Sequence, residues 1–475
     1  MNLRRAIAGV VVGVSLVGFG LAQRRDLHVP ISSFTNLGAP TLPFVPAGSF
    51  ITSSWFCPGV PAGAQGLGGV VVVTNPSDQP KHGQITVYSS DPTATAVVRP
   101  VDVAARTSAS IDLATLQTTG AYVSAVVEIE GGGGFVEQHA VHPAGDSVSP
   151  CANAASSNWY FADGFTASDS VEQIVLTNPY PEAAIVDIGF VTNAGVRNPS
   201  RLQGFPVPGR SVQVIELGAK DEPVIATKVV ASRGRVVAAR AQHYLGSGRL
   251  GFGLSLGAPA LADQYFFADG ESGTGISELY QVYNPTSQDV TVDARFLGVP
   301  ASDSFANDTQ IDVAAGRVVT LDVATVKGLP AGRHAAVFST FSTASIVVER
   351  VINRPAGKSV ATTVVMGMPG GLASARWSAA IGTDEPIEAG LVVLNADSVA
   401  TTVEVATLGP GGFVPVPGLE AVPLAAGGVV TVPLTDPSLL KAPLIITSKQ
   451  RLFVERLLGR GGDLRGRTGS FALSG

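Results

Sequence analysis

Apolar residues in this chain fall in short runs that alternate with turn-forming residues. The runs Gly69–Thr74, Ile174–Thr177 and Leu279–Tyr283 are rich in β-branched or aromatic side chains. Their length and composition are typical of β-strands, because a surface helix needs a longer run with a period near 3.6. Beyond the N-terminal stretch, the pattern predicts only single helical turns, at Asp112–Thr118 and Asp322–Gly328. The hydrophobic pattern therefore predicts an all-β protein.

One arrangement of residues recurs four times, at a spacing of a little over one hundred residues. Each copy opens on aromatic residues, continues to an apolar run closed by Asn, and ends near a Glu-Arg pair. The opening residues are Trp55, Trp159 with Phe161, Tyr265 with Phe267, and a weaker Trp377. The turn asparagines are Asn75, Asn178, Asn284 and Asn395, and the closing pairs are Glu137-Gln138, Ala239-Arg240, Glu349-Arg350 and Glu455-Arg456. A repeat of this length is a whole domain, not a solenoid unit.

The spacing of strands within a copy predicts four tandem antiparallel β-sandwich domains of the Ig-like kind. Their expected boundaries are 53–155, 156–262, 263–372 and 373–475, and we call these segments repeats one to four. A linker, 26–52, precedes them. Placed end to end, four such domains would reach about 140 Å. The alternative fold is a β-propeller whose blades are half-repeats.

The first 25 residues are predicted to be a targeting segment. Arg4 and Arg5 precede an uncharged apolar stretch from Ala6 to Ala22, and Arg24 follows it. The stretch is long for a signal-peptide core and short for a membrane span, so both a cleaved signal peptide and an uncleaved transmembrane anchor stay open. Either one places residues 26–475 outside the cytoplasm, membrane-anchored by the N-terminal helix or secreted.

The two cysteines agree with an extracytoplasmic location. Cys57 lies at the opening of repeat one and Cys151 just after its last predicted strand, and no other repeat has a cysteine. In an oxidising compartment this arrangement predicts one disulfide that joins the two ends of the repeat. The alternative is a pair of buried free thiols.

Composition narrows the possible partners. Charged residues make up 14% of the chain and the net charge is −6, so no broad basic surface for nucleic acid is expected. The 55 Gly and 32 Pro residues agree with many turns between short strands. The oligomeric state is not indicated by the sequence.

The motif residues are predicted to be structural. The opening aromatics are expected to fill the core or cover a junction between repeats, with a sugar-stacking platform as the alternative. Each turn Asn is expected to mimic a backbone turn before the next strand. The Phe-Ala-Asp-Gly tetrads, Phe161–Gly164 and Phe267–Gly270, are interpreted as turn formers, with Ca²⁺ binding as the alternative.

The Glu-Arg pairs do not predict acid–base chemistry. Adjacent residues on a strand face opposite ways, so Glu349 and Arg350, or Glu455 and Arg456, cannot form one catalytic couple. We expect them to be exposed or edge-buried charges that discourage strand addition. The sequence shows no nucleophile motif, paired glycosidase acids or metal spacing. It therefore predicts no catalytic residue, cofactor or metal.

The N-terminal segment, the openings Trp159–Gly164 and Tyr265–Gly270, Thr-Asn-Pro at 74–76 and 177–179, and Val-Glu-Arg at 348–350 and 454–456 resemble a known group. The chain resembles uncharacterised exported repeat proteins of actinobacterial cell envelopes, a domain family of unknown function. The resemblance implies an envelope location and carries no catalytic residues. The leading hypothesis is a non-enzymatic cell-envelope protein that acts as a structural spacer or surface binding module. Its partner would be an envelope protein or glycan, and the alternative is a glycan-binding accessory of envelope polysaccharide metabolism.

Overall fold

A computed structural model describes residues 41–299, 308–341, 345–380, 389–436, 438–439, 442–459 and 467–475 of the chain. The expected targeting segment lies outside the described residues. Within them, no helix has the length and hydropathy needed to cross a membrane.

The described chain is built almost wholly from antiparallel strands, so the all-β prediction is confirmed. Repeat one contains β1 (Thr52–Phe56), β2 (Val60–Pro61), β3 (Gly68–Asn75), β4 (Lys81–Ser89), β5 (Val97–Val103), β6 (Thr107–Asp112), the helical turn α2 (Leu113–Leu116), β7 (Tyr122–Glu130), β8 (Phe135–Val141) and β9 (Ser147–Pro150). Repeat two contains β10 (Asn158–Phe161), the 3₁₀ turn η1 (Ala167–Asp169), β11 (Val171–Asn178), β12 (Ala184–Thr192), β13 (Gly195–Arg197), η2 (Ser200–Leu202), β14 (Phe205–Val207), β15 (Ser211–Glu216), β16 (Ala226–Arg233), β17 (Val237–Gly246) and β18 (Arg249–Leu256).

The second half of the chain follows the same order of strands. Repeat three contains β19 (Gln264–Ser272), β20 (Ser277–Asn284), β21 (Val290–Leu297), β22 (Asp308–Val313), β23 (Arg317–Asp322), η3 (Val323–Thr325), β24 (Gly332–Thr340), β25 (Val347–Ala356), β26 (Ser359–Met366), β27 (Met368–Pro369) and η4 (Gly370–Leu372). Repeat four contains β28 (Ser374–Ala379), β29 (Gly390–Asn395), β30 (Thr401–Gly409), β31 (Gly412–Pro415), β32 (Val422–Leu424), β33 (Val429–Pro433), β34 (Leu444–Gly459), β35 (Arg467–Phe471) and β36 (Leu473–Ser474).

Each of the first three repeats forms two antiparallel sheets. In repeat three one sheet runs β22-β21-β24-β19-β27 and the other β23-β20-β25-β26, and the two share one hydrophobic core. Repeats one and two have corresponding pairs, β1-β7-β4-β5 with β6-β3-β8-β9, and β10-β16-β12-β13 with β15-β11-β17-β18. In repeat four the 16-residue β34 pairs with strands on both sides, so all nine strands join in one sheet. Strands from the start and the end of a repeat share a sheet, so the half-repeat propeller is wrong.

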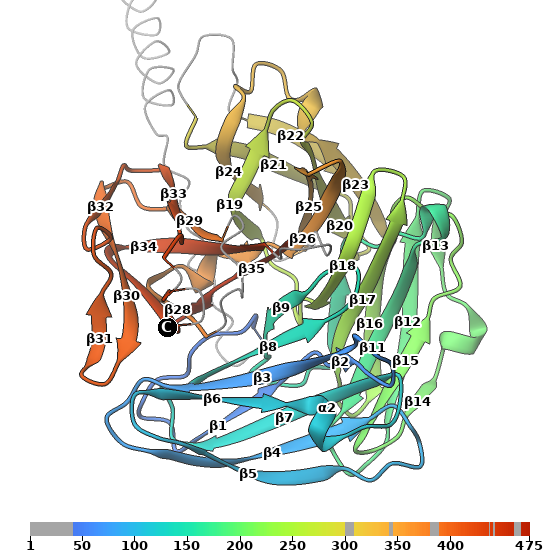
Figure 1. The fold of residues 1–475 in the computed structure, drawn as a ribbon. Helices are drawn as coiled ribbons and strands as arrows, with labels where there is room; N and C mark the ends of the chain where they lie inside the picture. Colours follow the sequence, from blue (N-terminus) through green and yellow to red (C-terminus); the bar gives the residue numbers. More distant parts are fainter. Residues whose placement is uncertain are drawn as a thin grey trace, which may run out of the picture.

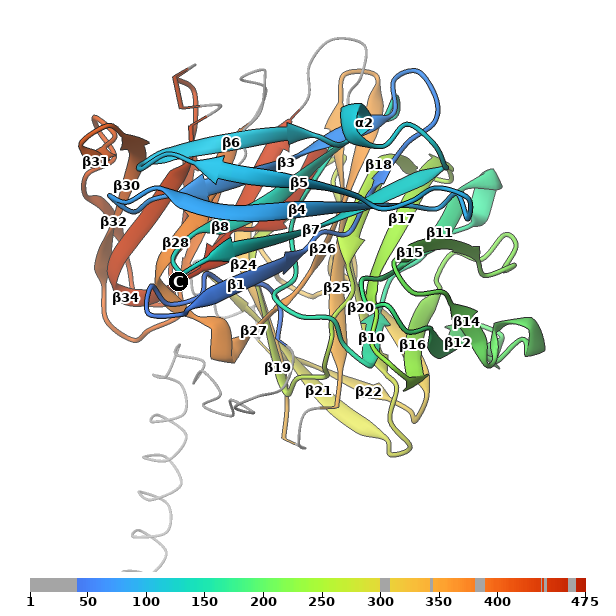
Figure 2. The same ribbon diagram turned by 90° about the horizontal axis from the view of Figure 1, so that it is seen from below.

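The four repeats close into a ring. The final strands β9, β18, β26 and β35 each lie against the next one around the centre, and β35 returns to β9 (Figure 1). Seen from below, repeat one lies across the front, with strands of repeat two on one side and of repeat four on the other (Figure 2). The expectation of repeats placed end to end is therefore wrong, because repeat four packs against repeat one.

The start of the described chain also ties repeat four to repeat one. Phe44 forms a parallel bridge with Ser474, and the Val45 N–H donates to the Ser474 carbonyl at 2.6 Å. The Phe44 N–H donates to the Asn153 side chain at 2.9 Å, and the Gly133 N–H donates to the Pro46 carbonyl at 2.7 Å. The segment thus joins the last strand of repeat four to two parts of repeat one.

The turn asparagines show why each repeat folds the same way. Asn178 is fully buried; its Nδ2 donates to the carbonyls of Glu182 and Val207, and its Oδ1 accepts from the Tyr180 N–H. The same pattern recurs at Asn75, Asn284 and Asn395. The side chain closes the turn after its strand and pins a distant carbonyl of the same repeat. Asn395 makes the full set although Ala396 replaces the proline that follows the other three.

The predicted helical turns also have a local cause. Asp112 and Asp322 accept hydrogen bonds from the N–H groups of Ala114 and Ala324, and so cap α2 and η3. Both helical-turn predictions are confirmed.

Candidate functional site: the junctions between repeats

The closing Glu-Arg pairs meet across the junctions, where each Arg reaches the Glu of the following repeat. Arg240 of repeat two holds Glu349 of repeat three with two hydrogen bonds of 2.8 and 2.9 Å. Arg350 holds Glu455 in the same way at 3.1 and 2.8 Å. Arg456 of repeat four holds Glu137 of repeat one at 3.0 and 2.6 Å. All six side chains are at most 2% exposed.

Each of these glutamates also accepts one or two backbone N–H groups from residues in or just after the opening strand of the preceding repeat. Glu349 accepts from Ala162 and Asp163, both at 2.7 Å. Glu455 accepts from Ala268 and Asp269 at 2.8 and 2.7 Å, and Glu137 accepts from Ala380 at 2.6 Å. A buried ion pair stabilises a fold only when further hydrogen bonds satisfy its polar atoms, and here the backbone supplies them.

The expectation that the Glu-Arg pairs are exposed or edge-buried charges is wrong, because β25 and β34 have a partner strand on each side at these residues. Glu349, Arg350, Glu455 and Arg456 are buried between repeats. Adjacent residues do point to opposite sides, as expected, but the two sides face the preceding and the following repeat. Each Glu bonds the preceding repeat and each Arg bonds the following repeat, so the pairs link the repeats in their order around the ring.

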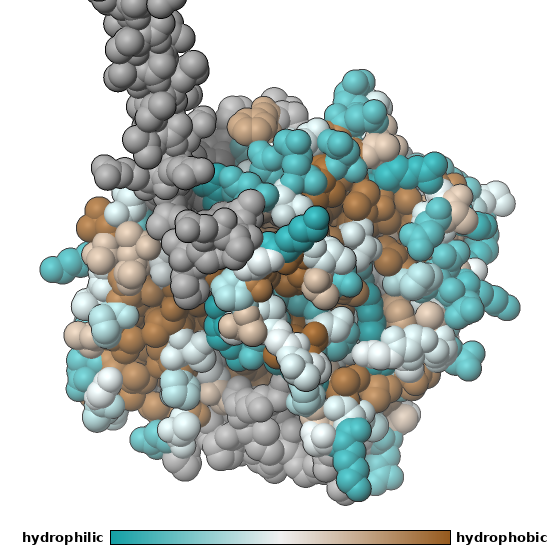
Figure 3. Space-filling model, turned by 90° about the horizontal axis from the view of Figure 1, so that it is seen from above, coloured by the Kyte–Doolittle hydropathy of each residue, from teal (hydrophilic) through white to brown (hydrophobic). Residues whose placement is uncertain are grey.

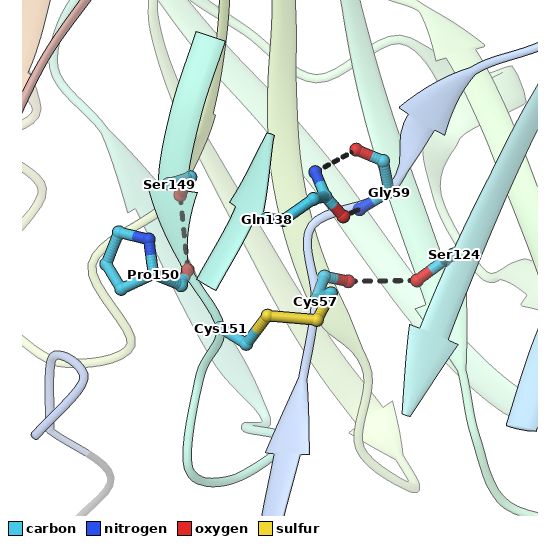
Figure 4. The surroundings of a disulfide bond; sticks show 7 residues. All are labelled: Cys57, Gly59, Ser124, Gln138, Ser149, Pro150 and Cys151. Atoms are coloured by element: carbon cyan, nitrogen blue, oxygen red, sulfur yellow. Dashed lines mark hydrogen bonds between the residues drawn. A yellow bond between two sulfur atoms is a disulfide. The ribbon is translucent and has the colours of Figure 1, made fainter. Parts of the chain in front are cut away.

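The junction between repeats one and two lacks the ion pair, because Gln138 and Ala239 stand at the Arg and Glu positions. Gln138 instead turns onto Gly59, which is equivalent to Asp163 in repeat two. Its Oε1 accepts from the Gly59 N–H at 3.0 Å and its Nε2 donates to the Gly59 carbonyl (Figure 4). In repeat two the Asp163 N–H bonds Glu349 and the Asp163 carbonyl accepts from Arg240. One amide side chain therefore satisfies both backbone groups, and no Glu is needed at position 239.

The disulfide prediction is confirmed, and the disulfide lies beside the Gln138–Gly59 hydrogen bonds. The sulfurs of Cys57 and Cys151 are 2.05 Å apart, and the Cα atoms are 4.2 Å apart (Figure 4). The Ser124 hydroxyl donates to the Cys57 carbonyl at 2.9 Å. The alternative of two free buried thiols is thereby excluded.

The Asp residues of the two Phe-Ala-Asp-Gly tetrads are not turn formers, because their carboxylates bond arginine side chains, so that interpretation is wrong. Asp163 and Asp269 are fully buried. Asp163 pairs with Arg249 at 3.1 Å, and Asp269 pairs with Arg333 and Arg354. Arginine rather than Ca²⁺ balances these carboxylates, and no group of three or more His, Cys, Asp or Glu in the described ranges could hold a metal ion.

Two equivalent buried glutamates differ in their surroundings. Glu278 of repeat three accepts from the Tyr280 hydroxyl at 2.6 Å and lies 3.1 Å from His334 Nε2. Burial favours a raised pKa for Glu278, but His334, Arg350 and the Tyr280 hydroxyl together outweigh burial and the pKa is lowered. Glu172 of repeat two is also buried, yet neither carboxyl oxygen has a hydrogen-bond partner. Burial raises the pKa of Glu172 to about 8, against the opposing charge of Arg240.

The opening aromatics line the core and the junctions. Trp55, Trp159, Phe161, Tyr265 and Phe267 are at most 1% exposed. The guanidinium carbons of Arg240 and Arg350 lie 5.6 and 5.8 Å from the ring centres of Phe161 and Phe267, within cation–π range. No face of these rings is open to stack on a sugar.

The described structure contains a cavity and a groove that could hold a small molecule. A cavity of about 80 Å³ lies at the centre, lined by β9, β18, β26, β35 and the N-terminal residues Leu42 and Pro43. A larger groove of about 470 Å³ lies between repeats three and four. Its lining includes Glu271, Arg333 and Arg354 of repeat three, and Gly390, Thr431 and Leu457 of repeat four. Seen from above, polar and apolar residues are interspersed on the described part of the surface (Figure 3).

Sequence reasoning missed the inter-repeat pairing, although the sequence contains a signal for it. Repeat one lacks the Arg and repeat two lacks the Glu, and these are the two partners of one junction. Such a complementary loss indicates a contact between successive repeats.

One family model matches part of the chain. A model described as a family of unknown function, DUF5719, matches residues 136–348. This region extends from repeat one into repeat three and includes the junction between repeats one and two. None of the curated proteins matches the sequence.

Two solved structures show weak likeness. One is the crystal structure of Thermotoga maritima 1070, with 15% identity, 22% of this chain and 92% of that chain covered, and a TM-score of 0.20. The other is Streptomyces avermitilis alpha-L-rhamnosidase complexed with L-rhamnose, with 10% identity, 86% and 46% coverage, and a TM-score of 0.13. Scores this low support no inference about this chain.

Proposed function

We propose that this protein is a non-enzymatic component of an actinobacterial cell envelope that acts outside the cytoplasm as a rigid spacer and binding module. The single observation that carries the proposal is the ring closed by buried inter-repeat ion pairs. A closed ring fixes the outward surfaces of its four β-sandwich, Ig-like domains relative to one another, as a presenting platform requires. The carboxylates of Glu349 and Glu455 are bound by arginine and backbone N–H groups, which leaves neither free for acid–base work.

An extracytoplasmic location is supported by two features. The Cys57–Cys151 disulfide needs an oxidising compartment to form and persist. The apolar stretch Ala6–Ala22 after Arg4 and Arg5 is suited to export, as an anchoring helix or as a cleaved signal.

Cell fractionation with protease treatment of intact cells tests the location. The proposal predicts that external protease digests the protein, and that its thiols react with maleimide only after reduction. Protein found in the cytosol with two reactive thiols would contradict it. N-terminal sequencing distinguishes the uncleaved anchor from the cleaved signal peptide, because the mature protein keeps residues 1–22 in the first case and lacks them in the second.

Assays for hydrolysis test the absence of catalysis. Glu349→Gln and Glu455→Gln are the variants to compare with the wild type on envelope polysaccharides. Turnover by the wild type that either variant abolishes, while the variant still folds, would establish an enzyme instead.

The second candidate, a glycan-binding accessory of envelope polysaccharide metabolism, is favoured by the groove between repeats three and four.

A further inference from the structure

The groove between repeats three and four is hollow where the preceding junction is filled. At the junction of repeats two and three, the ring centres of Phe165 and Tyr244 are 5.9 Å apart, and Val364 packs against them. The equivalent positions one repeat later are Glu271 and Arg354, which line the groove. The aromatic filling has thus been replaced by charged side chains that border open space.

Small residues enlarge the groove from the other side. Relative to the turn asparagines, Ala389 and Gly390 of repeat four occupy the positions of Glu278 and Leu279 in repeat three. Both small residues line the groove. Its volume, about 470 Å³, falls in the usual range of small-molecule sites.

The polar groups of the groove leave one donor unused. Arg354 is 5% exposed; its Nε donates to Glu271 at 2.7 Å and its Nη2 to Asp269 at 2.9 Å. Its Nη1 is buried and has no hydrogen-bond partner. A buried N–H without an acceptor is destabilising, so an oxygen atom from a ligand that reaches it would be stabilising. Arg333, 33% exposed, also pairs with Asp269 and Glu271.

The charge balance indicates the class of ligand. The guanidinium groups of Arg333 and Arg354 face the carboxylates of Asp269 and Glu271, so this set carries no excess charge to attract an ion. A neutral hydroxyl-bearing molecule suits it, because one hydroxyl accepts from Arg354 while another donates to Glu271. Apolar Ile276, Leu457 and Leu458 border the same groove and match the C–H faces of a sugar ring.

We propose that this groove binds a neutral carbohydrate of mono- to disaccharide size. The inference deepens the proposed binding-module function and rests on it. The buried opening aromatics take no part, so recognition comes from the arginine–carboxylate set and the apolar border.

Saturation-transfer difference NMR on the full-length protein tests the site, in a detergent without a sugar headgroup. The probes are cellobiose, mannobiose and chitobiose, with glucose 6-phosphate and glucuronic acid as charged counterparts. We expect saturation transfer to at least one neutral disaccharide and none to the charged sugars. Transfer to no neutral probe, or stronger transfer to a charged one, would overturn the proposal.

Two substitutions locate the binding. Thr431→Trp fills the groove from an exposed lining position on the edge strand β33, and should abolish transfer while leaving the melting temperature unchanged. Val414→Trp is the matched control, because Val414 is 50% exposed in the same repeat and lies outside the lining. Arg333→Ala serves as a second groove variant should Thr431→Trp fail to fold. Equal loss in the groove and control variants, or loss in neither, would overturn the assignment.

The result of the NMR binding test does not depend on the result of the cell-fractionation experiment. A protein that is exported and oxidised but binds no sugar refutes the groove alone. A reduced cytosolic protein refutes the envelope function whatever it binds.

Discussion

At the scale of the residue, one side chain can replace a pair of charges. Gln138 satisfies the N–H and carbonyl of Gly59, and the same two groups of Asp163 need both Glu349 and Arg240. The amide carries a donor and an acceptor on one group, so it closes the contact within its own repeat. The junction of repeats one and two therefore lacks the Arg–Glu pair found at the other junctions, and the neighbouring disulfide braces the same strand end.

Glu172 gives the first prediction at this scale. An unfolded Glu has a pKa near 4.3, whereas burial raises the pKa of Glu172 to about 8 in the folded protein. Between these values the unfolded chain releases a proton that the folded protein keeps, so stability falls as pH rises, by up to about 1.4 kcal/mol per unit. Glu172→Gln should therefore be more stable than the wild type at pH 8 and should lose this slope. Urea unfolding at pH 5.5 and 8 measures both effects.

The control for this prediction is Glu182→Gln, because Glu182 is exposed. It should follow the wild type at both pH values. A Glu172→Gln variant with the wild-type pH slope would show that Glu172 does not carry the proton.

Phe161 gives a second residue-scale prediction. Its ring is fully buried and lies below Arg240 at the junction of repeats two and three. Phe161→Ala should lower the free energy of unfolding by about 3–5 kcal/mol through the cavity it leaves. Tyr180→Ala, at a 39% exposed position, should cost far less. Equal losses in denaturant unfolding would argue against a core role for the opening aromatics.

At the scale of the element, local patterns were predictable and partner choice was not. The strands, the asparagine turns and the helical turns that begin at Asp112 and Asp322 depend on neighbours in the sequence, so their residues were sufficient to predict them. The disulfide followed from compartment and position. The role of Glu349 could not be predicted from its own strand, because its partner Arg240 lies 109 residues away in another repeat.

The sequence also misled where burial decides the chemistry. Asp163 before Gly is typical of a turn, yet its carboxylate is buried and paired with Arg249. Charged residues at repeat ends suggested exposed edges, because an isolated buried charge is too costly. Paired charges escape that cost once two repeats pack against each other and bring the partners together.

The junction between repeats one and two allows an element-scale prediction. Gln138→Arg or Ala239→Glu alone would bury an unpaired charge and should each destabilise by about 3–5 kcal/mol. Together they rebuild the pair found at the other junctions, so the double variant should be less destabilised than the sum of the two by more than about 1 kcal/mol. Effects in chemical unfolding that add to within about 0.5 kcal/mol would show that this junction is not equivalent to the others.

At the scale of the whole molecule, the ring has one closure that chain connectivity does not provide. Repeats one to four are joined in order along the chain, but repeat four meets repeat one only through non-covalent contacts in the described structure. The segment from Phe44 to Pro46 and the pair Arg456–Glu137 make this closure. The pair is separated by 319 positions in the sequence, so no linear array of domains would bring it together.

A double-mutant cycle on Glu137 and Arg456 tests the closed ring most directly. Glu137→Gln and Arg456→Met should each lower the free energy of unfolding by about 3–5 kcal/mol, because each leaves a buried partner unpaired. The double variant should lose less than the sum, with an interaction energy of about 1–3 kcal/mol. Losses that add to within about 0.3–0.5 kcal/mol would mean that the two residues do not meet, and would contradict the closed ring.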